Sequence, residues 1–189
     1  HKTSVAFLEI KQFLEEGYKP SDIFILAPSV KNSRSPVRLL ENEIKKKLID
    51  IPIYVPVSDE EKLDQEVLKN KMVFSTFHQA KGLERKIVIV FNFDASYFKY
   101  FKKKQNPNIC PNEMYVATTR AKNHLILLHH YQNDFLPFIN KQLLTKYGNV
   151  KYYTKMRLSA SNNNKNRKTS VTDLIRHLTQ ETVDTCLQY

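Results

Sequence analysis

Two separate segments of this sequence place polar, chemically capable side chains beside an apolar run. The first segment is Ser75–Glu84 and the second is Tyr115–Lys122. Each is followed by residues that read as a buried strand. Because ligands of parallel α/β sheets bind at the ends of strands, the pair predicts one shared functional surface.

Arg120 is the candidate for chemistry on a phosphoryl group. It stands at the expected end of a short helix, just before the apolar run Leu125–Leu128. Its planar guanidinium matches the geometry of phosphate oxygens. In phosphoryl transfer, an arginine supplied from another domain stabilises the charge that develops in the transition state. A surface salt bridge is the commoner use of an arginine, and the residue alone does not separate the two.

The residues from Thr76 to Glu84 put donors and an acceptor on a turn between two expected strands. Thr76 and His78 can donate to the phosphate oxygens of a nucleic-acid backbone. Glu84 can accept a hydrogen bond from a sugar hydroxyl or orient a cation. Gly82 permits a close approach of the backbone. An ordinary polar loop is the alternative interpretation.

The two segments resemble motifs V and VI of the UvrD/Rep/PcrA-type helicases of superfamily 1. The first is similar to motif V, T-x-H-x-A-K-G-L-E, and the second to motif VI, Y-V-A-x-T-R-A. The resemblance extends over residues 20–130 and is specific in these two blocks. The positions that match motif V are Thr76, His78, Ala80, Lys81, Gly82, Leu83 and Glu84.

The resemblance implies that the chain is the second RecA-like motor domain of an ATP-dependent DNA helicase, with a role in DNA repair or replication. Arg120 then corresponds to the arginine finger that contacts the γ-phosphate, and Gly82 and Glu84 face the nucleotide. ATP and Mg²⁺ are the implied cofactors, and an upstream first RecA-like domain binds most of both.

The same resemblance assigns the nucleic-acid side of the domain. Thr76 and His78 face the single strand, and Lys81 shapes the loop and joins them as a nucleic-acid-binding residue. The implied partners are single-stranded DNA, with RNA left open, and the upstream RecA-like domain.

Nothing in the sequence can cradle a triphosphate and its Mg²⁺ without help. A Walker A loop needs G-x-x-x-x-G-K-[ST] between a strand and a helix, and that string does not occur. No Asp-Glu pair closes an apolar run as a Walker B site does. We therefore expect this chain alone to be inactive. It starts at His1 rather than Met, so we expect it to be part of a longer protein.

Two places depart from the family pattern. After the apolar run Ile23–Ala27, motif IV carries an aromatic residue that stacks on adenine and then an arginine, but this chain has Ala27 and Pro28. Before motif VI the family often has Glu-Arg-Arg, and this chain has Pro111-Asn112-Glu113. The altered motif IV favours an alternative function, a RecA-like module that binds nucleic acid or a protein partner without ATP coupling.

The segment Tyr97–Lys104 interleaves aromatic and basic residues. Bases stack on aromatic rings and phosphates need cations, so the combination suits single-stranded nucleic acid. Equally, the aromatic residues could pack inward, as core anchors commonly do. The net charge of +11, from 30 Lys+Arg against 19 Asp+Glu, also favours a polyanionic partner. A lysine-rich surface typical of an AT-biased genome is the alternative.

The remaining composition narrows the class of protein. The apolar fraction of 41% supports a real core. Cys110 and Cys186 make no framework for disulfides or zinc, and no metal centre is expected from the histidines. No apolar run is long enough to span a membrane. We expect an intracellular protein of the nucleus or cytoplasm, and the Asn- and Lys-rich composition fits a viral or protist source.

The elements that must position these residues alternate between strands and helices. Several strands are continuously apolar, which predicts an α/β, RecA-like (P-loop NTPase) three-layer domain with a mainly parallel sheet. The expected strands are 23–27, 53–55, 72–76, 87–93, 124–128 and an edge strand at 150–153. The expected helices are 4–16, one capped by Ser35 before Pro36, 112–120 with Asn112 as its cap, and 135–147.

The domain boundaries follow from composition. Residues 1–158 form the RecA-like domain, and the Ser- and Asn-rich stretch 159–168 is a flexible linker. Residues 169–189 are a helical tail or the start of a further domain.

Overall fold

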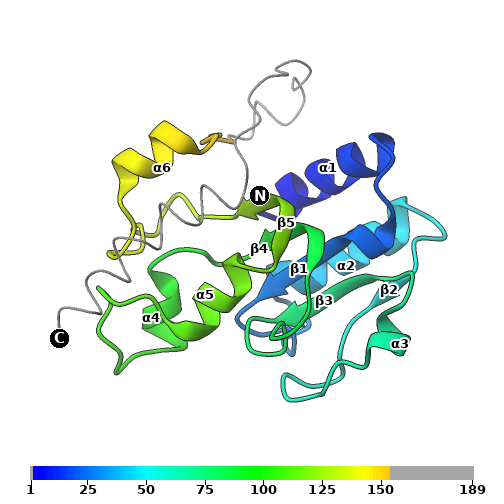
Figure 1. Ribbon diagram of the computed structural model, residues 1–189, viewed down its shortest axis with the longest axis horizontal. Coiled ribbons are helices and arrows are strands. Elements are labelled where there is room, and N and C mark those ends of the chain that lie inside the picture. Colours follow the sequence, from blue (N-terminus) through cyan, green and yellow to red (C-terminus); the bar gives the residue numbers. More distant parts are fainter. Residues whose placement is uncertain (1, 154–189) are drawn as a thin grey trace.

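Five strands form one parallel sheet with the order β2-β3-β1-β4-β5 in the computed structural model (Figure 1). The structure describes residues 2–153, so the expected linker and tail lie outside the described residues. The prediction of an α/β domain is confirmed. The strands are β1 (Ile23–Ala27), β2 (Ile53–Tyr54), β3 (Met72–Thr76), β4 (Arg85–Val90) and β5 (Ala121–Leu127).

Helices cover both faces of this sheet, which gives the three expected layers (Figure 1). One face packs against α1 and α2, and the other packs against α4 and α5. The helices are α1 (Lys2–Glu15), α2 (Pro36–Lys47), α3 (Gln65–Leu68), α4 (Ser96–Tyr100), α5 (Asn112–Thr118) and α6 (Lys141–Tyr147), with a 3-10 turn η1 at Pro20–Asp22.

The central strand β1 is apolar at every position because both of its faces are covered. Ile23 and Ile25 point into the core under α1 and α2, whereas Phe24 and Leu26 point into the core on the opposite face. Side chains alternate along a strand, so a strand covered on both faces must be apolar at every position. All five residues of β1 are buried.

The start of α2 follows the expected capping pattern. Ser35 has an extended backbone, and its side chain accepts a hydrogen bond from the backbone N–H of Arg38 at 3.4 Å. Pro36 follows as the first helical residue, where a missing N–H costs nothing. The side chains of Val37, Leu40 and Ile44 then face the core.

Several expected boundaries were wrong. Strand β4 begins at Arg85, two residues before the expected position, and ends at Val90. Asn112 does not cap α5, because Pro111 occupies the cap position and forms no side-chain cap bond. The helix thus starts one residue earlier than expected, and Asn112 is its first helical residue rather than its cap.

The C-terminal part of the described chain differs more. Only Lys141–Tyr147 of the expected helix 135–147 is helical. Asn140 sets its start, since its side chain accepts from the backbone N–H groups of Gln142 and Leu143 at 3.0 Å each. Residues 150–153 form no edge strand. Instead, the Tyr153 hydroxyl donates to Glu9 of α1 at 3.0 Å, which holds this segment against a helix rather than along β5.

A buried carboxylate ties together the segments around the carboxyl end of β4. Asp94 is fully buried and accepts hydrogen bonds from Lys2 Nζ at 3.0 Å, Asn133 Nδ2 at 2.8 Å and the backbone N–H of His130 at 3.1 Å, and also from Ser96. Burial opposes ionisation, but the Ser96 hydrogen bond and the Lys2 charge outweigh it and hold the pKa of Asp94 below its usual value.

Candidate functional site

The end of the first polar segment meets the second at the amino edge of the sheet, where β4 and β5 begin. Arg85 pairs with Ala121 in the sheet register. Immediately before that pair, the backbone N–H of Arg85 donates to the carbonyl oxygen of Arg120 at 3.1 Å. Glu84 and Lys122 form an ion pair at 3.2 Å, with both side chains more than half exposed. Glu84, Arg120 and Lys122 therefore share one surface. The prediction of a single surface for both segments was wrong for Thr76, which ends β3 at the opposite edge of the sheet.

The Arg120 side chain is folded back on α5. Its Nε donates to the carbonyl oxygen of Val116 at 3.0 Å, and its terminal NH2 donates to the Thr119 hydroxyl at 3.1 Å. A guanidinium here satisfies a carbonyl group that the end of a helix leaves without an intrahelical partner.

Gly82 lies in the exposed turn that leads to Glu84. Its φ of +82° is a left-handed conformation that residues with a Cβ rarely adopt. An added Cβ would meet no atom within 4 Å, so backbone conformation rather than space requires glycine here. The neighbouring Lys81 is exposed. The turn thus presents Lys81 and Glu84 on a backbone path that glycine allows.

Thr76 lies at the opposite, carboxyl edge, because it is the last residue of β3 and pairs with Ala27 at the end of β1. It is only 2% exposed. Its hydroxyl donates to Gln79 Oε1 at 3.0 Å and accepts from the backbone N–H of Gln79 at 3.2 Å. The structure therefore turns the Thr76 hydroxyl toward Gln79.

Gln79 is a residue that sequence reasoning missed. Its side-chain oxygen accepts from Ser75 and from Thr76, and its Nε2 donates to the carbonyl oxygens of Ser58 and Glu61 at 3.0 and 2.8 Å. An amide carries donors and an acceptor, so it can cross-link two backbone segments. Its position between two motif residues was the available signal.

His78 is exposed at the carboxyl edge and lies near the start of α5. Burial of Glu113 on α5 opposes its ionisation. The hydrogen bond from Lys102 at 2.6 Å and the positive charges of Lys102 and His78 outweigh that effect and lower the pKa of Glu113. His78 therefore lies in the neighbourhood of Glu113 and its partner Lys102.

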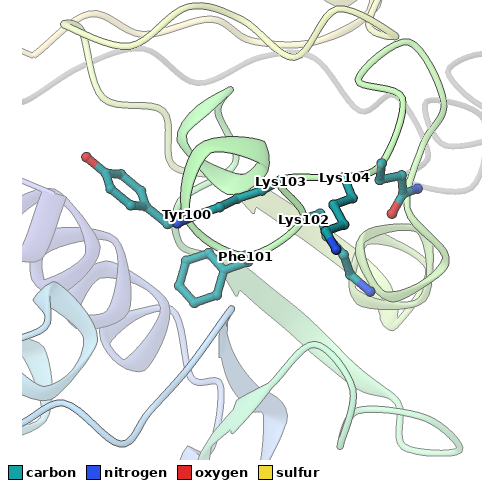
Figure 2. A pocket seen from close by; sticks show the side chains of 6 residues that line it. Tyr100, Phe101, Lys102, Lys103 and Lys104 are labelled. Atoms are coloured by element: carbon teal, nitrogen blue, oxygen red, sulfur yellow. The ribbon is translucent and has the colours of Figure 1, made fainter.

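The aromatic and basic segment beyond β4 divides between the core and the surface. Tyr97 and Phe98 are buried, whereas Tyr100 is 62% and Phe101 46% exposed. Figure 2 shows the rings of Tyr100 and Phe101 on one side of this segment and the side chains of Lys102 and Lys104 on the other. We call residues 100–105 the basic ledge, and they line an open hollow of about 540 Å³. The inward-packing interpretation is thus confirmed for Tyr97 and Phe98, and Tyr100 and Phe101 stay exposed, so the nucleic-acid interpretation of them remains a prediction.

The basic ledge connects to motif V through stacked rings. Phe101 stacks on Tyr97 with ring centroids 5.7 Å apart and an interplanar angle of 23°. Tyr97 in turn contacts Phe77 at 5.7 Å, and Phe77 directly precedes His78. The ledge and His78 therefore belong to the same edge of the sheet and rest on a common aromatic support.

A second hollow of about 290 Å³ opens between the carboxyl ends of β1 and β4. The chain leaves β1 toward β2 and leaves β4 toward β5, in opposite directions along the sheet. Crevices of this kind are the usual ligand positions in open parallel sheets. Pro28, Ser29, Asn32, Asn92 and Phe101 are among the residues that line it. Pro28 replaces the expected motif IV arginine here, and Phe101 borders both hollows.

Residues 2–153 contain no group of three or more His, Cys, Asp or Glu side chains placed to hold a metal ion. His124 Nε2 instead shares a hydrogen bond of 2.9 Å with the Tyr18 hydroxyl, and the ring of His129 stacks on that of Phe135. Within the same residues, no helix has both the length and the apolar character needed to cross a membrane.

Comparison with protein-family models finds a match in the middle of the chain. The model of the UvrD-like helicase C-terminal domain matches residues 37–132, which is just over half of the 189 residues. The matched stretch includes both polar segments, from Ser75 to Lys122. A search of curated proteins found no match to the chain.

Proposed function

Because this chain belongs to the family of UvrD-like helicase C-terminal domains, we propose that it is the second motor domain of an ATP-dependent superfamily 1 DNA helicase. The observation that carries the proposal is the meeting of Glu84, Arg85 and Arg120 at the amino edge of the sheet. A surface that combines a carboxylate and an arginine can complete a nucleotide site supplied by a second domain.

The amino edge is the nucleotide face in this proposal. An upstream RecA-like domain holds ATP and Mg²⁺, because residues 2–153 offer no carboxylate cluster for the metal. Arg120 leaves the end of α5 and stabilises the negative charge that develops on the γ-phosphate. Glu84 accepts from a ribose hydroxyl, with Gly82 shaping the turn. The exposed ion pair between Glu84 and Lys122 is easily broken, since such pairs contribute at most about 1 kcal/mol to stability.

The carboxyl edge is the nucleic-acid face. His78 donates to the backbone of a single strand of DNA, and Thr76 contributes through its hydrogen bonds to Gln79. Lys81, exposed on the turn that leads from this edge toward Glu84, adds a cation to the same loop. The basic ledge extends this face, because the exposed rings of Tyr100 and Phe101 can stack on bases beside the lysines. A strand held mainly by backbone contacts is gripped without regard to sequence.

Helix α5 links the two faces. Its first turn carries Glu113, near His78, and its last turn receives the Arg120 guanidinium. Met114 and Ala117 are fully buried, so the helix is anchored in the core between these ends. A movement of the amino edge against the upstream domain is therefore transmitted to the nucleic-acid face by a packed element.

The test is DNA-stimulated ATP hydrolysis by a protein that contains this chain together with its upstream RecA-like domain. We expect single-stranded DNA to raise the hydrolysis rate, and a partial duplex with a single-stranded tail to be unwound. A protein that binds the strand but hydrolyses no ATP would instead support the second candidate function.

That second candidate is a RecA-like nucleic-acid-binding or interaction module without ATP coupling. The observation that favours it is Ala27 and Pro28 at the hollow where the family has an adenine-stacking residue and an arginine. Ala27 cannot stack on adenine as an aromatic ring does, and Pro28 cannot contact phosphates as an arginine does. ATP binding by this domain therefore depends on the amino edge.

A further inference from the structure

Two loops leave the carboxyl ends of the neighbouring strands β1 and β3, and a third segment joins them. The loop after β3 carries His78 and Gln79, and the loop after β1 carries Ser29 and Val30. The joining segment is the turn Ser58–Glu61, which is closed by a hydrogen bond from the Glu61 N–H to the Ser58 carbonyl at 3.4 Å.

Gln79 attaches the loop after β3 to this turn. Its Nε2 donates to the carbonyl oxygens of both residues that close the turn, Ser58 at 3.0 Å and Glu61 at 2.8 Å. Its Oε1 accepts from the Ser75 hydroxyl at 3.2 Å and from the N–H and hydroxyl of Thr76 at 3.1 and 3.0 Å. The Gln79 amide therefore joins the end of β3 to a turn that lies 18 residues or more earlier in the sequence.

Asp59 attaches the loop after β1 to the same turn. One carboxylate oxygen accepts from the Ser29 hydroxyl at 2.6 Å, and the other accepts from the Val30 N–H at 2.9 Å. Ser29 lines the hollow between β1 and β4. The exposed turn thus holds both loops through polar contacts.

We propose that the turn Ser58–Glu61 is a bracket that positions His78 relative to the hollow at the ends of β1 and β4, with Gln79 and Asp59 as its two positioning residues. The role in strand binding rests on the proposed function, whereas the mechanical coupling of the two loops does not. Gln79 and Asp59 touch neither the strand nor the nucleotide in this scheme.

The first arm of the test measures the coupling alone, by amide hydrogen exchange on the full 189-residue chain. Gln79→Met keeps a similar shape and removes the hydrogen bonds to Ser58 and Glu61. It should speed exchange at residues 29–31, in the other loop. Asp59→Ala should likewise speed exchange at residues 76–80. Wild-type exchange rates in the distant loop for both variants would overturn the bracket, whatever the chain binds.

The second arm measures binding of a labelled oligothymidine by the same variants. Asp59→Ala removes a negative charge, so electrostatics alone would strengthen binding of a polyanion. The bracket instead predicts binding about three- to tenfold weaker, because His78 loses its placement. Glu60→Ala is the matched control, since it removes the same charge from an exposed side chain of the same turn and should not weaken binding.

A double-mutant cycle separates positioning from general destabilisation. If Gln79 acts through His78, Gln79→Met should weaken binding much less in a His78→Ala background than in the wild type. Full additivity of the two changes, in variants that remain folded at the assay temperature, would overturn the positioning role. A wild-type chain that binds no oligothymidine would overturn the proposed strand face, and the positioning role with it, while the exchange arm still decides the coupling.

Discussion

The backbone N–H of Arg85 donates to the carbonyl oxygen of Arg120 at 3.1 Å, and this contact joins the two motif segments at the start of β4 and β5. It places Glu84, which precedes Arg85, next to the residues that follow Arg120, and the Glu84–Lys122 ion pair is the consequence. The amino edge is therefore built by strand pairing, at a point where the register between β4 and β5 shifts between Arg85 and Ile87.

Replacing Arg120 with alanine should abolish ATP hydrolysis in a protein that contains both RecA-like domains. A finger acts on charge in the transition state, so the rate should fall roughly 10³- to 10⁵-fold while ATP binding stays nearly intact. Single-turnover hydrolysis and equilibrium binding of a fluorescent ATP analogue measure the two quantities. Lys46→Ala, an exposed cation on α2, is the control. Equal losses of binding and turnover would contradict the assignment.

The 189-residue chain alone should show no ATPase activity and should bind nucleotide poorly. The reason is that its sequence has neither a Walker A loop nor a Walker B pair to hold the triphosphate and its metal. Phosphate release by the purified chain, with and without single-stranded DNA, is the measurement. Steady hydrolysis that survives removal of contaminating enzymes would show that the nucleotide site is complete without an upstream domain.

His78→Ala and Lys81→Ala should each weaken binding of single-stranded DNA by the full chain. Each neutralised phosphate contributes about −0.7 to the slope of log K against log salt, so Lys81→Ala should make that slope shallower. Fluorescence anisotropy across a salt series measures it, with Lys46→Ala as a control that removes one charge elsewhere. Identical slopes and affinities for Lys81→Ala and Lys46→Ala would mean that general surface charge, and not this loop, binds the strand.

Phe101→Ala should weaken strand binding by about 1–3 kcal/mol, the usual contribution of one base stacked on an aromatic ring. The effect should persist at high salt, because stacking does not depend on counterions. Tyr152→Ala removes another exposed ring, 69% accessible, and should leave the affinity unchanged. A Phe101 variant that binds as tightly as the wild type would restrict the basic ledge to electrostatic contacts.

Asp94→Asn should destabilise the fold by about 3–5 kcal/mol, because it leaves the Lys2 ammonium without its buried partner. The folded-state pKa of Asp94 lies below the value in the unfolded chain, so its stabilising contribution is full above about pH 4 and is lost as pH falls through the lower folded value. Urea unfolding between pH 7 and pH 3 measures this. Asp134→Asn, an exposed carboxylate, should change stability little.

Much of the fold and part of the site could be predicted from residue order. β1 and β3 were predicted with their observed boundaries. β1 is an unbroken apolar run, as a strand buried on both faces requires, and β3 begins with one, Met72–Phe74. The cap at Ser35 and Pro36 was predictable because helix starts depend on local chemistry. The expected helix 135–147 was too long at its start. Residues 135–139 have the apolar content of a helix, but the residue that caps the helix is Asn140.

Only the tertiary structure decided which site residues lie together. In sequence, Thr76 and Glu84 belong to one motif, but the chain crosses the sheet between them, so Thr76 ends at the carboxyl edge and Glu84 at the amino edge. Parallel strands require this, since the end of one strand and the start of the next lie at opposite edges. Residue order determined which side chains are present, while strand pairing determined that Glu84 meets Arg120 and that Thr76 faces Gln79.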